Sequence, residues 1–117
     1  MALFDKIRAM ANSSLKRIVH QIERIKEELL LIGEMRPGSL TKQYRQPKEK
    51  KGGFYQISYT YKMKSKTEYV RPQHLDDLKR QVETYQKFKG LIEEWIDLAI
   101  THSKLKIQID NRNQEND

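Results

Sequence analysis

The sequence predicts an α+β chain in which a long helix, a small three-stranded antiparallel sheet and a second long helix follow one another. Three observations predict this order: apolar residues recur at heptad spacing in the first third, alternate with polar residues in the middle third, and return to helical spacing in the last third. With 117 residues, 37% of them hydrophobic, the chain has room for one domain with a thin core. We expect a single helix-sheet-helix domain over residues 1–109, with coiled-coil-like helix packing, and a disordered polar tail over residues 110–117.

The first helix is expected over residues 1–33, where two apolar series at heptad spacing form a seam. The first series is Phe4, Ala11, Ile18, Ile25 and Ile32, and the second is Leu15, Ile22 and Leu29 after Arg8. Isoleucine at one seam position with leucine or isoleucine at the other is typical of coiled coils. Further apolar residues widen this face and leave an ordinary core-facing helix open as an alternative; they are Val19, Leu30 and Leu31.

Local signals predict where the first helix begins and ends. Gly33 suits a left-handed C-cap, and Arg36-Pro37-Gly38 is typical of a turn. The helix should therefore stop near Ile32. The Asn12-Ser13-Ser14 stretch leaves open whether the helix is continuous or begins again there.

The sheet is expected over residues 37–71. Tyr55, Ile57, Tyr59 and Tyr61 alternate with mainly polar residues, which is the period of a strand. A turn at residues 63–66 should lead to the hairpin partner "TEYVR", and "SLTKQYR" supplies a third strand. The helix-facing side should carry Leu40, Tyr55, Ile57, Tyr59 and Val70. The opposite side should present Thr41, Gln43, Arg45, Gln56, Ser58, Thr60, Lys62, Thr67, Tyr69 and Arg71.

The second helix is expected over residues 72–109, opening at Pro72 with acidic residues in its first turns. Its apolar seam changes register between Tyr85 and Phe88, and a second apolar strip runs beside it. Apolar helix faces of this extent indicate a homodimer or a higher closed oligomer. The expected oligomer interface comprises Ile18, Ile22, Ile25, Leu29, Ile32, Phe88, Leu91, Trp95 and Leu98.

The positive charge is confined to the centre of the chain. The net charge of +7 divides into +1 over residues 1–35, +8 over residues 36–73 and −2 over residues 74–117. Such a basic segment indicates nucleic-acid binding, with a merely solubilising sheet face as the alternative. The expected nucleic-acid-binding residues are Lys42, Arg45, Lys48, Lys50, Lys51, Gln56, Lys62, Lys64, Lys66 and Arg71.

Several short motifs between residues 36 and 98 resemble a family of small bacterial and archaeal proteins of unknown function that are often linked with mobile elements. These motifs are Pro37-Gly38-Ser39-Leu40 with Tyr44, Gly53-Phe54-Tyr55, Ile57-Ser58-Tyr59, Lys66-Thr67, Tyr69-Val70, Val82, Tyr85 and Phe88-Lys89. The resemblance implies the architecture and a mobile-element setting. Members usually carry three cysteines where this chain has "QPKEKK", so the metal knuckle that the family implies is not expected.

The strand motif "FYQISYTYKMKSKTEYV" is also similar, more loosely, to the small arm-binding domain at the start of phage and transposon tyrosine recombinases. In that domain a three-stranded sheet is laid against a helix. The resemblance implies that the sheet enters the major groove of DNA.

Residues with catalytic or metal-binding patterns are scarce. The chain has no cysteine, its three histidines are far apart in sequence, and Gly52-Gly53 lacks the surroundings of a phosphate loop. We therefore expect no catalysis, no cofactor, no metal and no small-molecule substrate. The lack of a long apolar run also predicts no membrane association and a cytoplasmic location.

Two functions remain open from the sequence. The first is an accessory protein that binds nucleic acid, DNA before RNA, with helices for oligomerisation and a basic sheet for phosphate and groove contacts. The second is a coiled-coil adaptor or scaffold subunit that binds a larger protein of a mobile-element or nucleoprotein machine. Lysines and aromatic residues serve DNA and RNA equally well, so the sequence does not separate the two nucleic acids.

Overall fold

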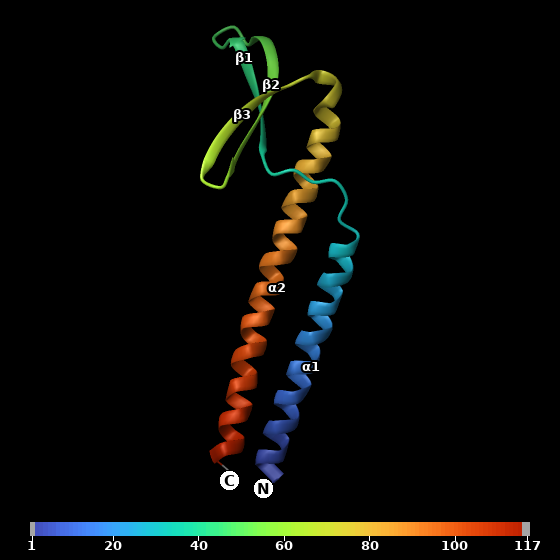
Figure 1. The fold of residues 1–117 in the computed structure, drawn as a ribbon, viewed down its shortest axis with the longest axis vertical. Coiled ribbons are helices and arrows are strands. Elements are labelled where there is room, and N and C mark those ends of the chain that lie inside the picture. The colour runs from blue at the N-terminus through green and yellow to red at the C-terminus, as the bar shows by residue number, and fades with distance from the viewer. Residues whose placement is uncertain (1, 116–117) are drawn as a thin grey trace. The chain divides into compact units, whose positions relative to one another are not determined.

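A computed structural model describes residues 2–115 and confirms the α+β order of the elements (Figure 1). Helix α1 (Ala2–Leu30) is followed by β1 (Ser39–Gln46), β2 (Lys51–Tyr61) and β3 (Lys64–Val70). A short 3₁₀ helix, η1 (Pro72–His74), then leads into α2 (Leu75–Glu115). The expected single domain divides into two compact units. A helical unit contains the residues up to Leu31 and from Gly90 onward, and a sheet unit contains Ile32–Lys89.

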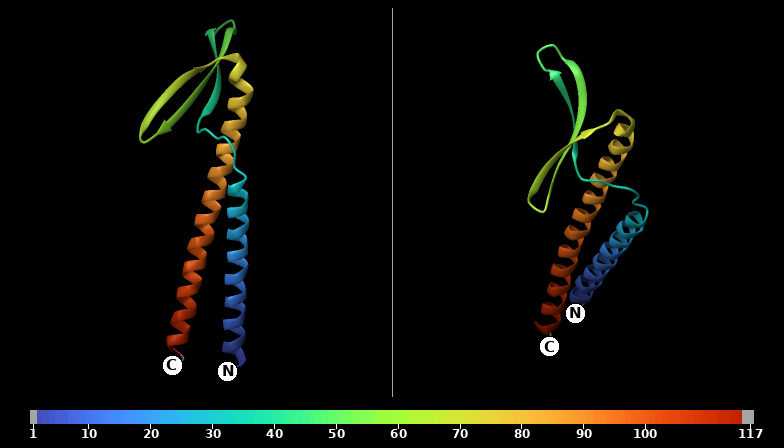
Figure 2. Two further views of the ribbon diagram at one scale, coloured as in Figure 1. Left: turned by 45° about the vertical axis from the view of Figure 1, so that its right-hand side comes forward. Right: turned by 45° about the horizontal axis from the view of Figure 1, so that its top comes forward.

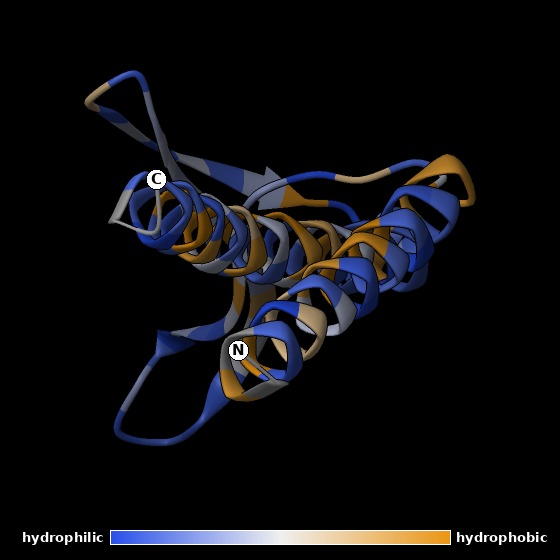
Figure 3. Cartoon of the chain, turned by 90° about the horizontal axis from the view of Figure 1, so that it is seen from below, coloured by the Kyte–Doolittle hydropathy of each residue, from blue (hydrophilic) through white to orange (hydrophobic). Residues whose placement is uncertain are grey.

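In the helical unit, α1 and the later part of α2 lie side by side and antiparallel (Figures 1 and 2). Apolar positions recur turn after turn along both helices (Figure 3). Ile18, Ile25 and Leu91 are buried, and the ammonium of Lys26 lies 5.4 Å from the ring centroid of Trp95. The heptad register predicted for the first helix is therefore the observed one.

Much of the expected oligomer interface is already covered within one chain. Ile18, Ile25 and Leu91 are buried without a second chain, and the other expected interface residues are half-buried; these are Ile22, Leu29, Ile32, Phe88, Trp95 and Leu98. The chain folds back on itself, so the seams of α1 and α2 meet within one molecule. Val19, Leu30 and Leu31 stay exposed and do not widen the buried face of α1.

Helix α1 is continuous through Asn12-Ser13-Ser14. The Ser14 hydroxyl donates to the carbonyl oxygen of Met10 at 3.1 Å, which satisfies the side chain inside the helix rather than at a cap. The expected left-handed cap at Gly33 is wrong, since the positive-φ glycines of residues 2–115 are Gly38 and Gly52. Instead, the Leu31 N–H donates to the carbonyl oxygen of Glu28 at 3.1 Å, which tightens the last turn.

The expected turn at residues 36–38 is also wrong, because this segment carries no turn assignment. Gly38 has φ of 152° and passes so close to Ile57 that a Cβ on Gly38 would lie 2.7 Å from its Cγ1. The Arg36 N–H donates to the carbonyl oxygen of Gln81 on α2 at 3.1 Å. The segment therefore runs directly along the core of the sheet unit instead of reversing direction.

The sheet has the order β1-β2-β3 and is antiparallel throughout. Its β2-β3 turn consists of Lys62 and Met63, both with positive φ, so the turn expected at residues 63–66 is two residues long and earlier. Two-residue turns of this kind match the twist of paired strands. As a result, Lys64 and Lys66 belong to β3.

The second helix starts later and ends later than expected. Pro72 opens η1, and α2 begins at Leu75 with Asp76 and Asp77 in its first turn. The helix continues to Glu115, so the expected disordered tail is wrong for residues 110–115; residues 116–117 lie outside the described part. Extending an existing helix through a stretch without proline or glycine costs far less than nucleating one. No helix within residues 2–115 has the length and apolarity needed to cross a bilayer.

Candidate nucleic-acid interface

The strand register sorts the sheet into two faces, because residues directly opposite each other in an antiparallel pair point to the same side. Ile57 pairs with Leu40 and Glu68, while Gln56 pairs with Thr41 and Tyr69. We call the Ile57 side the inner face and the Gln56 side the outer face. This division is the one that the alternation of the sequence predicted.

The inner face carries the core of the sheet unit and packs against the start of α2. Ile57 is 1% exposed and Val70 is buried. The Lys79 ammonium of α2 lies 5.7 Å from the ring centroid of Tyr55. The Lys42 ammonium lies 5.9 Å from the same centroid and 5.5 Å from that of Tyr44. Lys42 therefore lies among inner-face rings and away from the outer face.

The outer face carries most of the side chains expected opposite the helix, but only Arg45 and Gln56 of the expected nucleic-acid-binding residues. By register it carries Thr41, Gln43, Arg45, Phe54, Gln56, Ser58, Thr60, Thr67 and Tyr69. Hydroxyl pairs link the strands across it: Ser58 and Thr67 lie 3.0 Å apart, and Thr60 and Ser65 lie 2.8 Å apart. These bonds tie the strands together across the face, whose longer polar side chains are Arg45, Gln43 and Gln56.

An aromatic pair lies on the outer face. The ring centroids of Phe54 and Tyr69 are 6.2 Å apart, and the Arg45 guanidinium carbon lies 5.8 Å from the Phe54 centroid. Tyr69 is 56% exposed. Phe54 is not among the contact residues predicted from the sequence, although its even position in the alternation assigns it to this face. The pair offers a stacking surface beside a cation.

The lysines form two groups at opposite ends of β2. The loop cluster is Lys48, Lys50 and Lys51, and the tip cluster is Lys62, Lys64 and Lys66. Lys50 and Lys62 both have positive φ and stand at the turns themselves. At about 3.3 Å per residue, Lys51 and Lys62 are separated by about 35 Å along the strand.

The tip cluster lines a small hollow together with aromatic rings. Its volume is about 290 Å³, and it is lined by Tyr59, Tyr61 and all three lysines. Lys64 pairs with Tyr61 and Lys66 with Tyr59 in the register, and the Lys62 ammonium lies 5.3 Å from the Tyr61 ring centroid. Lys64 and Lys66 thus lie on the inner-face side of the sheet, and the expected binding residues do not all share one surface.

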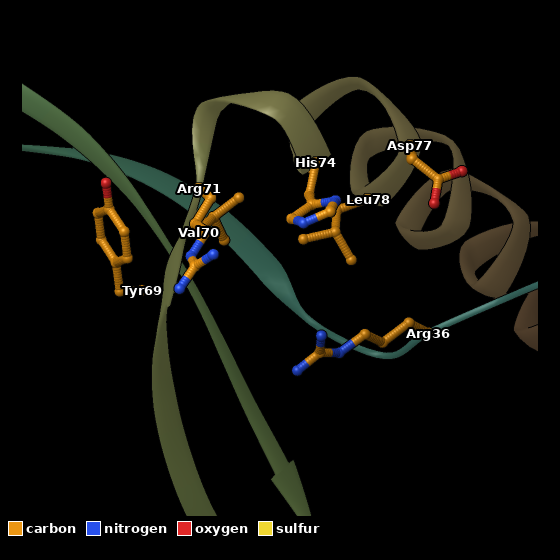
Figure 4. A pocket seen from close by; sticks show the side chains of 7 residues that line it. All are labelled: Arg36, Tyr69, Val70, Arg71, His74, Asp77 and Leu78. Atoms are coloured by element: carbon orange, nitrogen blue, oxygen red, sulfur yellow. The ribbon is translucent and has the colours of Figure 1, made fainter.

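A second hollow, of about 370 Å³, lies where β3 meets η1 and α2 (Figure 4). Arg71 and His74 line it from the β3-η1 connection, Arg36 from the segment before β1, and Asp77 from α2. The guanidinium of Arg36 points into this space, whereas the Asp77 carboxylate is turned away (Figure 4). Asp77 instead accepts a hydrogen bond from the Gln81 amide at 3.0 Å.

Arg36 already has a carboxylate partner. Its guanidinium forms an ion pair with Glu68, and the Tyr59 hydroxyl donates to the other carboxylate oxygen at 3.1 Å. The hydrogen bond from Arg36, reinforced by the one from Tyr59, lowers the pKa of Glu68. Arg36 therefore links the segment that precedes β1 to β3. The side chain of Arg71, the other arginine that lines this hollow, makes no hydrogen bond or ion pair with the described residues.

No model of a known protein family, no curated protein and no solved structure matches this chain. The two resemblances drawn from the sequence therefore stay predictions.

Proposed function

We propose that this chain binds nucleic acid through its sheet unit, with duplex DNA as the preferred form. The observation that carries the proposal is the arrangement of β2. Around this strand, the outer face of the sheet presents hydrogen-bonding side chains and a cation beside an aromatic pair, and a lysine cluster lies at each end of β2. This arrangement supplies charge for phosphates and polar groups for base edges in a single small sheet.

The spacing of the lysine clusters favours a duplex. The two clusters are separated by about 35 Å along β2, and one turn of B-DNA advances by about 34–36 Å. The contour of β2 between the clusters is therefore comparable to one helical turn, so a sheet lying along the duplex would hold lysines near phosphates at both of its ends. Phosphate contacts of this kind position a protein without reading sequence.

The outer face supplies the groups that read bases. Arginine and glutamine make paired hydrogen bonds to guanine and adenine edges in the major groove, and Arg45 and Gln56 lie on this face. The Phe54–Tyr69 pair offers a second use, since exposed rings stack with unpaired bases. Duplex and single-strand binding therefore use different residues of the same face.

The experiment is a mobility-shift assay of the full chain with duplex DNA, single-stranded DNA and structured RNA over a series of salt concentrations. We expect binding that weakens steeply as salt rises, and tighter binding of the duplex than of the single strand. If the chain bound the single strand more tightly and Tyr69→Ala abolished that binding, single-strand recognition by stacking on the aromatic pair would replace duplex binding as the proposal. Absence of binding to all three at low salt would overturn it.

A sequence preference would be tested with outer-face variants. Arg45→Ala and Gln56→Ala should relax discrimination between duplex sequences and leave the salt dependence nearly unchanged, because base contacts release few counterions. Thr60→Ala is the matched control, since its hydroxyl already pairs with Ser65.

A coiled-coil adaptor is the second candidate function. It is favoured by apolar side chains that a single chain leaves exposed on the helical unit, among them Leu30, Ile96 and Ile107. An adaptor would use these residues to bind another protein, and its sheet would show no salt-dependent nucleic-acid binding. The same shift assay therefore separates the two candidates.

A further inference from the structure

A strip of apolar side chains on α2 is left uncovered by the helical unit. Ile96, Ile100 and Ile107 are 51%, 49% and 55% exposed. At 100° per residue the strip lies about 130° around the helix from the seam that faces α1. Its positions are Ile92, Ile96, Ala99, Ile100, Ser103 and Ile107, and those of the seam are Leu91, Trp95, Leu98, His102, Leu105 and Ile109. The described residues of the helical unit therefore give this strip no partner.

The charges beside the strip are segregated along the helix. Glu93, Glu94 and Asp97 precede its centre, Lys104 and Lys106 follow it, and residues 98–103 contain no Asp, Glu, Lys or Arg. Helical periodicity places Glu93, Asp97 and Lys104 on the same flank of the strip. The strip is thus bordered by an acidic half and a basic half around a neutral centre.

This charge order is complementary to itself in one orientation. Two copies that cross antiparallel, with a two-fold axis near residues 100–101, place Asp97 of each copy opposite Lys104 of the other. The same axis brings the exposed isoleucines of both copies together. A parallel pair, with its two-fold axis along the helices, would place this flank on opposite sides of the two copies and leave Asp97 and Lys104 without this pairing, so it is disfavoured.

We propose that this strip is a self-association surface that takes a second copy of the chain in antiparallel orientation. The assembly is isologous, since the same patch serves both copies. It replaces the seam as the oligomer interface and gives each particle two sheet units. The proposal stands on the strip and its charges alone and does not depend on nucleic-acid binding.

The first test is sedimentation equilibrium of the full chain over a range of protein concentrations. We expect a monomer-dimer equilibrium that Ile100→Asp shifts toward monomer by roughly tenfold or more, because a carboxylate would be buried without a partner. Met10→Asp, at an exposed position of α1 outside the strip, should leave the equilibrium unchanged. Circular dichroism checks that both variants stay helical. A monomer at every concentration overturns the proposal, as does a dimer indifferent to Ile100→Asp.

Charge reversal tests the orientation. Asp97→Lys and Lys104→Glu should each weaken the dimer several-fold, since each creates two like-charge pairs about the axis, and exposed pairs contribute about 0.2–1 kcal/mol each. The double variant Asp97→Lys with Lys104→Glu should restore dimerisation. A double variant that dimerises no better than either single one would overturn the antiparallel arrangement.

Cross-linking gives an independent readout, because the chain has no cysteine. Ile100→Cys lies at the proposed axis and should form an intermolecular disulfide under mild oxidation. The two copies of Ile92→Cys would be about 25 Å apart, far beyond disulfide reach, and should stay reduced. Equal cross-linking at both positions would contradict the antiparallel arrangement.

Discussion

At the scale of single residues, the strictest requirement is at Gly38. This glycine combines φ of 152° with a close approach to Ile57, the most buried side chain of the sheet unit. An added methyl group would meet Ile57 Cγ1 at 2.7 Å and Cδ1 at 2.8 Å. The sequence marks the position only as part of a Pro-Gly turn signal, and the contact that makes glycine necessary comes from a residue 19 positions away in the chain.

We predict that Gly38→Ala destabilises the sheet unit by about 2–4 kcal/mol, from overpacking and backbone strain together. Gly33→Ala is the matched control, because nothing lies within 4 Å of its added Cβ and its φ is not positive. That change should be neutral or stabilise by up to about 1 kcal/mol. Urea unfolding followed by circular dichroism measures both. Equal effects of the two variants would contradict the proposed role of the Gly38 contact.

The ion pair of Glu68 should make the stability of the sheet unit decrease at acidic pH. Its pKa is lowered by the hydrogen bond from Arg36 and then by that from Tyr59. Because the folded-state pKa lies below the unfolded one, the stabilisation is complete above the ordinary glutamate pKa and is lost as the pH falls through the lowered value.

We therefore expect Glu68→Gln to lower the melting temperature at neutral pH. The melting temperature of this variant should also decrease less than that of the parent as the pH is lowered. Thermal unfolding over a pH series measures this, and Glu49→Gln in the β1-β2 loop is the control. A parallel acid dependence in Glu68→Gln and the parent would mean that the ion pair contributes nothing to stability.

At the scale of elements, the β2-β3 turn carries strain that a single substitution should relieve. Met63 has φ of 65° and is 98% exposed, so its side chain contributes no packing in exchange for an unfavourable conformation. Met63→Gly should stabilise the hairpin by about 1 kcal/mol. Thermal unfolding measures the gain, and Lys66→Gly in β3 should be destabilising instead. A loss of stability in Met63→Gly would show that the turn adopts another geometry.

The elements themselves were predictable because their signals are periodic. The alternation around Ile57 sets both faces of β2, and the heptads through Ile18 and Ile25 set the buried side of α1. Their ends were less predictable. Gly33 and Gly38 each match a local rule for caps or turns, but the first helix closes through Leu31, and the path of Gly38 is decided by its contact with Ile57.

The candidate site was predictable in composition and less so in geometry. A count of charges places the basic residues in the sheet but does not say which face of the sheet each side chain occupies. It therefore does not distinguish Lys42 on the inner face from Arg45 on the outer face. The pairing of Phe54 with Tyr69 and the capture of Arg36 by Glu68 join residues 15 and 32 positions apart. Such contacts follow from the packing of strands, which a local pattern does not specify.

At the scale of the whole molecule, the location of the charge links fold and function. The helical unit is built from segments that are nearly neutral, whereas residues 36–73 alone carry a net charge of +8. Much of this positive charge lies in the loop cluster and the tip cluster, at the two ends of β2. If this arrangement serves phosphate binding, removing charge from one end of the sheet should matter more than removing the same charge elsewhere.

The decisive variant replaces Lys62, Lys64 and Lys66 together by Gln, which keeps aliphatic stems against Tyr59 and Tyr61. Each phosphate contact on B-DNA contributes about 0.9 to the slope of log affinity against log salt, so we expect weaker duplex binding and a slope flatter by about 2 to 3. Circular dichroism should show the strands intact, because Lys64 and Lys66 stay at exposed positions of β3.

The matched control replaces three exposed lysines outside the sheet, Lys6, Lys16 and Lys87, and removes the same charge. If the tip cluster contacts phosphates, this control should keep nearly the parental slope and lose affinity only through the smaller long-range field, which salt screens within about 10 Å at moderate ionic strength. Equal slopes in both triple variants would mean that net charge alone drives binding. If the tip-cluster variant bound like the parent at every salt concentration, these lysines would only increase solubility. That result would favour the adaptor function.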